Sequence, residues 1–133
     1  MIQAERSEPV WIGKTVALAI HDRQLAEHGG PSGVRDNGML ESALMRPVNQ
    51  WAYGEDDLST LAAAYAFGIA RNHPFADGNK RTAWMLARLF LARNGVELAF
   101  VPAEATQTVV ALAAGELSES ALADWLRAQV RAP

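Results

Sequence analysis

The most apolar stretch of the chain spans residues 58–72 and reads LSTLAAAYAFGIARN. Leu61, Tyr65 and Ile69 follow one another at intervals of four residues, which places them on one face of an α-helix. The many alanines, together with Gly68, leave room for close approach by neighbouring helices. The stretch therefore predicts a buried helix that packs closely against its neighbours.

Helical signals recur on both sides of this stretch. Upstream, one predicted helix spans residues 14–28 and ends at a glycine pair. A second has Asp36 as its N-cap and runs through Arg46, where Pro47 is expected to stop it. Downstream, the predicted helices span residues 79–94, 103–114 and 118–130.

Two short segments resemble strands rather than helices. Residues 96–101 alternate apolar and polar side chains, and residues 10–12 form a short apolar run. The sequence leaves open whether these two segments pair. The expected fold class is all-α, a compact bundle of about six helices with at most two short strands, in a single domain covering residues 1–133.

Composition excludes several classes of protein. The chain has 133 residues and no cysteine, which rules out disulfide scaffolds, thiolate zinc sites and cysteine nucleophiles. Its net charge of −3 disfavours a broad nucleic-acid surface, so we expect no direct binding to nucleic acid. The first residues do not resemble a secretory signal, and no apolar run reaches the ~20 residues that span a bilayer. We therefore expect a soluble cytoplasmic protein without membrane contact.

Residues 73–82 read HPFADGNKRT and combine several chemically useful groups. The stretch lies between two predicted helices, and free N–H groups at a helix start, preceded by glycine, form an anion site. Lys80 and Arg81 add positive charge there, Asp77 offers one carboxylate for Mg²⁺, and His73 is a possible general base. Each residue alone has an ordinary structural explanation as a cap, a packing residue or a solvated charge. Their coincidence in one loop favours a functional site.

This loop resembles the signature of the Fic/Doc superfamily, H-x-F-x-D/N-G/A-N-G/K-R. Lys80 resembles the Doc branch, because Fic members usually carry glycine there and a second arginine where this chain has Trp84. The likeness runs from about Gly13 to Asp124, nearly the whole chain. It includes residues 20–22, 29–36, 40–44, 47, 90–91 and 94–95.

The resemblance implies a toxin of a type II toxin–antitoxin pair, with the fold of that superfamily. It implies a protein kinase that uses ATP and Mg²⁺ to phosphorylate a threonine of elongation factor Tu and so blocks translation. His73 would accept the proton of the target hydroxyl, Asp77 would hold Mg²⁺, and Phe75 would anchor the loop. The phosphates would be bound by Gly78, Asn79, Lys80 and Arg81, with Arg71 as an accessory contact. The expected partner is a Phd-like antitoxin that folds on binding.

Three other functions stay open at this point. An adenylyltransferase would share the loop, although Lys80 and Trp84 count against it. A metal phosphohydrolase or nuclease would need more metal ligands than Asp77. A catalytically weak module that acts by binding its antitoxin would tolerate the loss of His73.

Residues outside the motif receive structural interpretations. His21 is expected to pack within its helix rather than bind a metal, and residues 29–33 are expected to form a turn. Arg35 and Asp36 predict a helix cap with a local ion pair. Trp51 and Tyr53 are placed in a polar loop, where they would either return to the core or face a partner.

Overall fold

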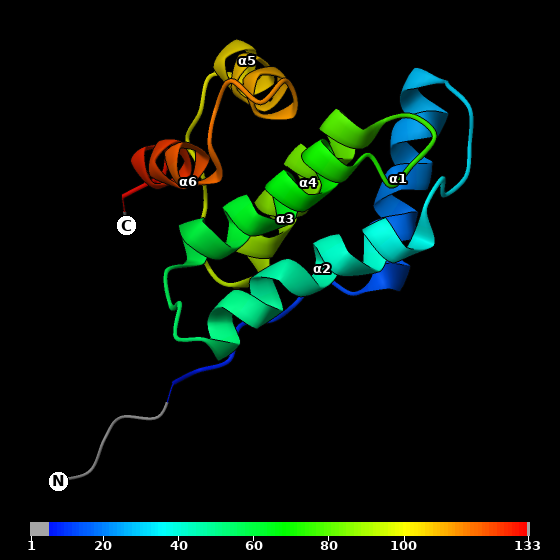
Figure 1. The fold of residues 1–133 in the computed structure, drawn as a ribbon. Coiled ribbons are helices and arrows are strands. Elements are labelled where there is room, and N and C mark those ends of the chain that lie inside the picture. Colours follow the sequence, from blue (N-terminus) through cyan, green and yellow to red (C-terminus); the bar gives the residue numbers. More distant parts are fainter. Residues whose placement is uncertain (1–5, 133) are drawn as a thin grey trace, which may run out of the picture.

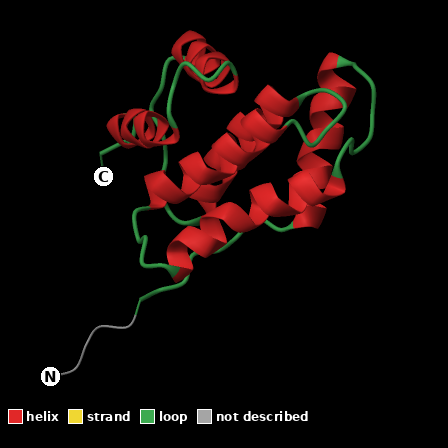
Figure 2. Ribbon diagram, in the orientation of Figure 1, coloured by secondary structure: helices red, strands yellow, loops and turns green. Residues whose placement is uncertain are grey.

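The computed structural model describes residues 6–132, which form six α-helices joined by loops (Figures 1 and 2). The helices are α1 Lys14–His28, α2 Asn37–Ala52, α3 Leu58–Asn72, α4 Asn79–Arg93, α5 Pro102–Ala113 and α6 Glu119–Ala128. Figure 1 shows α3 and α4 in the middle, with α1 and α2 on one side and α5 and α6 on the other. The all-α fold class expected from the sequence is confirmed.

Helix α3 is the centre of the bundle. It packs against α2, α4, α5 and α6, and ten of its fifteen residues are buried. Asp57 begins the helix as N-cap, because its side chain accepts hydrogen bonds from the N–H groups of Ser59 (2.8 Å) and Thr60 (3.2 Å). Gly68 lies where α2 crosses, and a Cβ there would come within 2.8 Å of the Ala43 Cβ. The small residues therefore allow the close contact that the sequence predicted.

Helix α2 does not stop at Pro47, so the sequence prediction is wrong here. The helix continues to Ala52 with Pro47 inside it and buried. Proline removes one backbone hydrogen bond from a helix interior. Packing offsets this loss, because the extra turn brings Trp51 edge-on to Trp11 with ring centroids 6.2 Å apart. Tyr53 is 94% exposed, so the two aromatic residues separate, one packing on the core and one facing solvent.

Neither expected strand forms within the described residues, where only isolated β-bridges occur. In the first segment, the N–H of Ile12 donates to the Tyr65 hydroxyl (2.9 Å), and burial raises the pKa of this phenol to about 12. In the second, Leu98 forms one bridge with Val130 near the C-terminus and not with residues 10–12. Both segments bond to residues far away in the sequence, and a local alternation of apolar and polar side chains cannot specify such partners.

The bounds of α1, α5 and α6 match the sequence prediction within two residues at each end. None of the helices in residues 6–132 is long and apolar enough to cross a membrane.

Candidate active site

The loop between α3 and α4 begins with a strained residue. His73 caps α3 in the left-handed conformation (φ 49°, ψ 57°), the only non-glycine residue in the described part of the chain with positive φ. Such a conformation is unfavourable for residues with a Cβ and tends to occur at functional sites. The strained backbone turns the chain sharply, and the His73 side chain is exposed at the edge of a cavity.

Phe75 fixes the middle of the loop. Its side chain is only 1% exposed and stacks on the His21 ring of α1, with centroids 3.8 Å apart and planes at 8°. His21 is itself buried, and its Nε2–H donates to the Asp77 carbonyl at 2.8 Å. His21 therefore packs within the fold, as expected, and also positions the backbone of Asp77.

Asn79 closes the loop on itself. Its side-chain oxygen accepts from the Phe75 N–H and its amide donates to the Phe75 carbonyl, both at 3.0 Å. This side chain was predicted to bind phosphate. Because its side-chain amide is engaged with Phe75, the Asn79 group left for a phosphate is its backbone N–H, which has no acceptor within residues 6–132.

Arg35 supports the loop from the α1–α2 connection. Its guanidinium donates to the His73 carbonyl (2.8 Å) and the Asn72 carbonyl (2.9 Å), which are left without helical partners at the end of α3. Asp36 is the N-cap of α2, as predicted, through a bond from the Met39 N–H. The predicted ion pair between Arg35 and Asp36 is wrong: none joins them in the described structure, because Arg35 binds these carbonyls instead.

Asp77 presents a carboxylate to solvent. Among the described residues, no side chain or N–H group forms a hydrogen bond with it. Gly30, with φ 116°, lies directly against it, and a Cβ there would collide with the carboxylate oxygen Oδ2. The glycine pair that ends α1 therefore also makes room for Asp77, a role that no local sequence signal reveals.

The start of α4 is an anion site by geometry. Its N-cap is Gly78 (φ 76°, ψ 16°), with no capping side chain and no acidic residue in the first turn. The N–H groups of residues 78–81 have no acceptor within residues 6–132, and the first bonded one is that of Thr82. Lys80 and Arg81 are exposed in this first turn. Free N–H groups, the helix dipole and two cations together favour a phosphate.

Six of the eight predicted site residues line one cavity of about 660 Å³. These are His73, Asp77, Gly78, Asn79, Lys80 and Arg81. The opposite wall comes from Trp84 and Arg88 of α4, Phe100, and residues of α5. Phe75 lies beneath, in the core. Arg71 lies elsewhere: its guanidinium is near Gly115 and 5.4 Å from the Phe67 ring, and it does not line this cavity.

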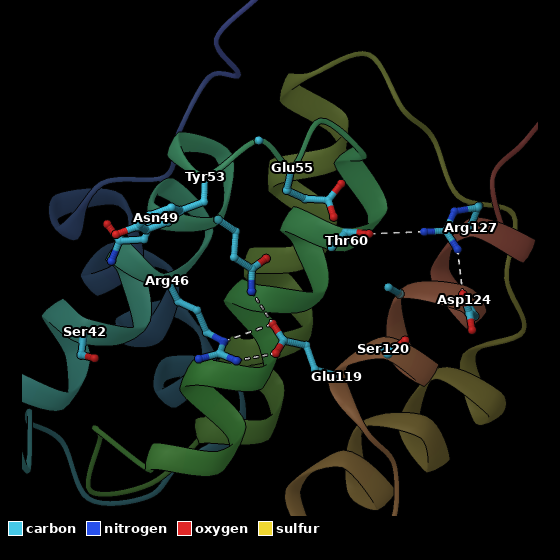
Figure 3. A pocket seen from close by; sticks show the side chains of 13 residues that line it. Ser42, Arg46, Asn49, Tyr53, Glu55, Thr60, Glu119, Ser120, Asp124 and Arg127 are labelled. Carbon is cyan, nitrogen blue, oxygen red and sulfur yellow. Dashed lines mark hydrogen bonds and ion pairs between the residues drawn. The ribbon is translucent and has the colours of Figure 1, made fainter.

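A second cavity, of about 830 Å³, lies between α2 and α6 (Figure 3). Arg46 forms a forked ion pair with Glu119 (2.5 and 3.1 Å), and Gln50 donates to the same carboxylate. The hydrogen bond to Glu119 raises the pKa of Arg46. Arg127 instead contacts two different carboxylates, donating from Nε to Asp57 (3.0 Å) and from Nη1 to Asp124 (2.8 Å). Although this cavity is larger, its two arginines already form ion pairs with carboxylates, so we take the motif cavity as the candidate active site.

Comparison with known proteins agrees with this site. A family model described as Fic/DOC family matches residues 11–91. The chain is 44% identical over 111 residues to "Protein kinase doc" of Escherichia phage P1, covering 83% of this chain and 87% of that protein. It is 50% identical over 74 residues to "Toxin Doc" of Mycolicibacterium smegmatis, covering 53% and 56%. The resemblance drawn from the motif is confirmed, and the chain belongs to the Fic/Doc family.

Proposed function

We propose that this protein is a toxin with protein kinase activity, which transfers the γ-phosphoryl group of ATP to a threonine hydroxyl of elongation factor Tu. The observation that carries the proposal is the shared cavity of His73, Asp77 and the uncapped start of α4. An exposed imidazole, a carboxylate that forms no hydrogen bond within residues 6–132 and a helix start suited to phosphate are groups that support phosphoryl transfer. The names of the two relatives, a protein kinase and a toxin, support the same activity.

His73 is the proposed general base. His73 is exposed and lines the cavity, and its backbone carbonyl is held by Arg35, so the residue is presented from a fixed position. It would accept the proton of the threonine hydroxyl as the oxygen forms a bond to the γ-phosphorus. The bond between that phosphorus and the β–γ bridging oxygen breaks, and ADP leaves. Lys80, Arg81 and the N–H groups at the start of α4 would neutralise the charge on the phosphates.

Asp77 is the proposed protein ligand for Mg²⁺. The fit rests on its exposed carboxylate, which has no hydrogen-bond partner among the described residues. No group of three or more His, Asp or Glu side chains in residues 6–132 forms a metal cluster. One carboxylate suits Mg²⁺, which keeps waters and binds substrate phosphates, and the ion would add charge neutralisation at the phosphates.

We further propose that a Phd-like antitoxin partners this protein in the cell. Toxins must be restrained in the cells that make them, and one relative is named as a toxin. A disordered antitoxin segment that folds on binding would provide this restraint.

The test is an incubation of the purified protein with elongation factor Tu, Mg²⁺ and ATP, followed by intact mass spectrometry of the acceptor. We expect a gain of one phosphoryl group, reduced at least hundredfold in rate by His73→Ala, in the range typical for loss of a general base. His28→Ala is the matched control, because His28 is exposed at the end of α1, outside the cavity.

Two other outcomes would contradict the proposal. A gain of one adenylyl group would identify an adenylyltransferase. An unmodified acceptor, with a cellular phenotype that survives His73→Ala, would favour a module that acts by binding its antitoxin.

A further inference from the structure

One arginine contacts the two peptide groups on either side of the candidate general base. The Nε–H of Arg35 donates to the His73 carbonyl (2.8 Å), and Nη2–H donates to the Asn72 carbonyl (2.9 Å). These carbonyls belong to the peptide groups that follow and precede the His73 Cα. Because peptide groups are planar, φ and ψ of His73 define how the two are oriented relative to each other. A single side chain therefore spans both torsion angles of His73.

The guanidinium of Arg35 is suited to this task because its shape is rigid. It is planar and always charged, and it carries its N–H donors in a fixed fork. Two carbonyls that accept from arms of one such group cannot turn independently of each other. Arg35 has no ion pair with a carboxylate in residues 6–132, so its side-chain hydrogen bonds are those to Asn72 and His73.

Local preferences oppose the conformation that His73 adopts. Its backbone is left-handed, with φ 49° and ψ 57°. This region is unfavourable for a residue with a Cβ, and a residue before a proline is biased towards extended backbone. Pro74 follows His73 directly. Such a conformation persists only where the surrounding structure holds it, so contacts from elsewhere in the fold must supply the constraint.

The peptide group between His73 and Pro74 depends on Arg35 for its hydrogen bond. Proline has no N–H, so the His73 carbonyl is the one polar group of this peptide. Within residues 6–132 its hydrogen-bond donor is the Arg35 guanidinium alone. The preceding peptide group is also held by α3, because the His73 N–H donates to the Ile69 carbonyl (3.2 Å). Removal of the guanidinium would therefore free ψ of His73 while the end of α3 keeps its own bond.

The backbone of the same α1–α2 connection holds the rest of the loop. The N–H groups of Arg35 and Asp36 both donate to the Pro74 carbonyl (2.7 and 3.0 Å), and the Ala76 N–H donates to the Gly33 carbonyl (3.1 Å). These bonds use backbone groups, which a substitution at position 35 leaves in place. A change of the Arg35 side chain therefore alters the support of His73 without detaching the loop.

We propose that Arg35 is a positioning residue for the general base: its guanidinium holds His73 in the left-handed conformation that serves the cavity. This inference rests on the proposed function, since it takes His73 as the base for the acceptor hydroxyl. Arg35 does not line the cavity itself. It acts through His73 and adds no chemical step.

The test compares Arg35→Met and Arg35→Lys in the full chain. Methionine keeps a long side chain without donors, whereas lysine keeps the charge but presents it as a point instead of a fork. With ATP, Mg²⁺ and elongation factor Tu, we expect Arg35→Met to lower kcat about tenfold, because a misplaced group loses rate. Arg35→Lys should still lower kcat about fivefold. The KM for ATP should stay within about twofold in both, since nucleotide binding does not involve Arg35.

The backbone of His73 provides a second readout that does not depend on activity. The ¹³C chemical shifts of the Cα and carbonyl carbons report φ and ψ of a residue. In the protein without substrate, both shifts of His73 should move towards extended values in Arg35→Met. The shifts of Phe75 should stay in place, because the Asn79 side chain holds both backbone groups of Phe75.

Arg93→Met is the matched control. Arg93 is an exposed arginine at the end of α4, has no ion pair in the described structure and lies outside the cavity. It should leave kcat, KM and the His73 shifts unchanged. Thermal melting of every variant checks that a loss of rate does not come from unfolding.

A double variant shows whether Arg35 acts through His73. Two residues that serve one function are not additive when both are changed. Added to His73→Ala, Arg35→Met should therefore lower the residual rate by less than about twofold.

Three results would overturn the proposal. Unchanged kcat and unchanged His73 shifts in Arg35→Met would mean that the backbone contacts of the α1–α2 connection suffice. A lower kcat with unchanged shifts, or a further tenfold loss in the His73→Ala background, would mean that Arg35 acts on the substrates directly. A higher KM for ATP with unchanged kcat would make Arg35 a binding residue.

The chemical shifts also separate this inference from the proposed function. If they move as expected but wild-type protein modifies no acceptor, Arg35 keeps its role in holding His73 and the kinase proposal is removed. If wild-type protein phosphorylates its acceptor while the His73 shifts stay in place in Arg35→Met, the kinase proposal stands and this inference is removed.

Discussion

The two cavities of this molecule differ in how their charges are used. In the cavity between α2 and α6, Arg46 and Arg127 are paired with carboxylates at 2.5–3.1 Å. In the cavity beside α4, Lys80, Arg81 and Asp77 have no such pairs within the described residues. Paired charges satisfy each other and contribute to stability, whereas unpaired charges that converge on a cavity are available to a ligand. Cavity size alone would select the cavity between α2 and α6 instead of the motif cavity.

A matched pair of carboxylate-to-amide substitutions tests this contrast with the largest expected effect. Asp77→Asn should lower the rate of phosphoryl transfer more than about hundredfold, since metal-ion charge stabilisation contributes several kcal/mol. It should change the free energy of unfolding by less than about 0.5 kcal/mol, because no side chain or N–H group in residues 6–132 forms a hydrogen bond with the carboxylate. Rates come from intact mass spectrometry, and stability comes from urea denaturation.

Glu119→Gln should show the opposite pattern. It weakens the forked pair with Arg46 in a part-buried position, which should cost about 1–2 kcal/mol of unfolding free energy. The transfer rate should stay near that of the wild type. If Glu119→Gln also abolished transfer, the second cavity would take part in the chemistry and the contrast would fail.

The residue that supports the loop of the candidate active site, His21, gives the next largest effect. His21→Ala removes the ring that stacks on Phe75 and the donor to the Asp77 carbonyl. We expect transfer to fall about tenfold, because a poorly positioned group loses part of its contribution to the barrier. The measurement is kcat at two Mg²⁺ concentrations, well below the melting temperature. Higher Mg²⁺ should restore part of the rate if Asp77 is displaced.

His21→Gln separates positioning from packing. Its amide nitrogen can replace the Nε2–H donor, so we expect it to recover part of the lost rate. Equal kcat in His21→Ala and wild-type protein would show that the hydrogen bond to Asp77 has no role in transfer.

Sequence alone could predict the elements whose signals are local. Helix α3 has its predicted bounds because Asp57, the apolar run and the turn at His73 all fall within or beside the helix. Helix α2 exceeds its predicted end because Trp51 packs on Trp11, forty residues away in the sequence. A proline signal is local, and such a tertiary contact overrides it.

The same distinction applies to the candidate active site. The motif residues are contiguous, so their chemistry could be interpreted from the sequence. His21, Gly30 and Arg35 lie 37 to 56 residues before the groups they support, and only the fold brings them there. For Asn79, the motif predicted a phosphate contact but did not reveal a second role. Its side chain forms two hydrogen bonds with the Phe75 backbone and so closes the loop.

The smallest expected effect concerns the stability of the protein in acid. It depends on Asp57, which pairs with Arg127 of the cavity between α2 and α6. Burial acts to raise the pKa of Asp57, but hydrogen bonds from Arg127, Thr60 and Ser59 outweigh it and lower the pKa below its ordinary value of 3.8. The folded state therefore binds fewer protons at Asp57 than the unfolded state. The stabilisation is fully present above the unfolded pKa and is lost as the pH falls through the folded one.

Asp57→Asn should remove this pH dependence. At pH 7 we expect the variant to be less stable than the wild type by under about 1 kcal/mol, because the Asp57 side chain is 39% exposed and solvent screens its ion pair. At about pH 3 the difference should narrow, since the wild-type carboxylate begins to protonate there. Urea denaturation of both proteins at the two pH values gives the comparison. A gap that stays constant on acidification would mean that the Asp57 charge contributes nothing and that the side chain acts only as a neutral helix cap.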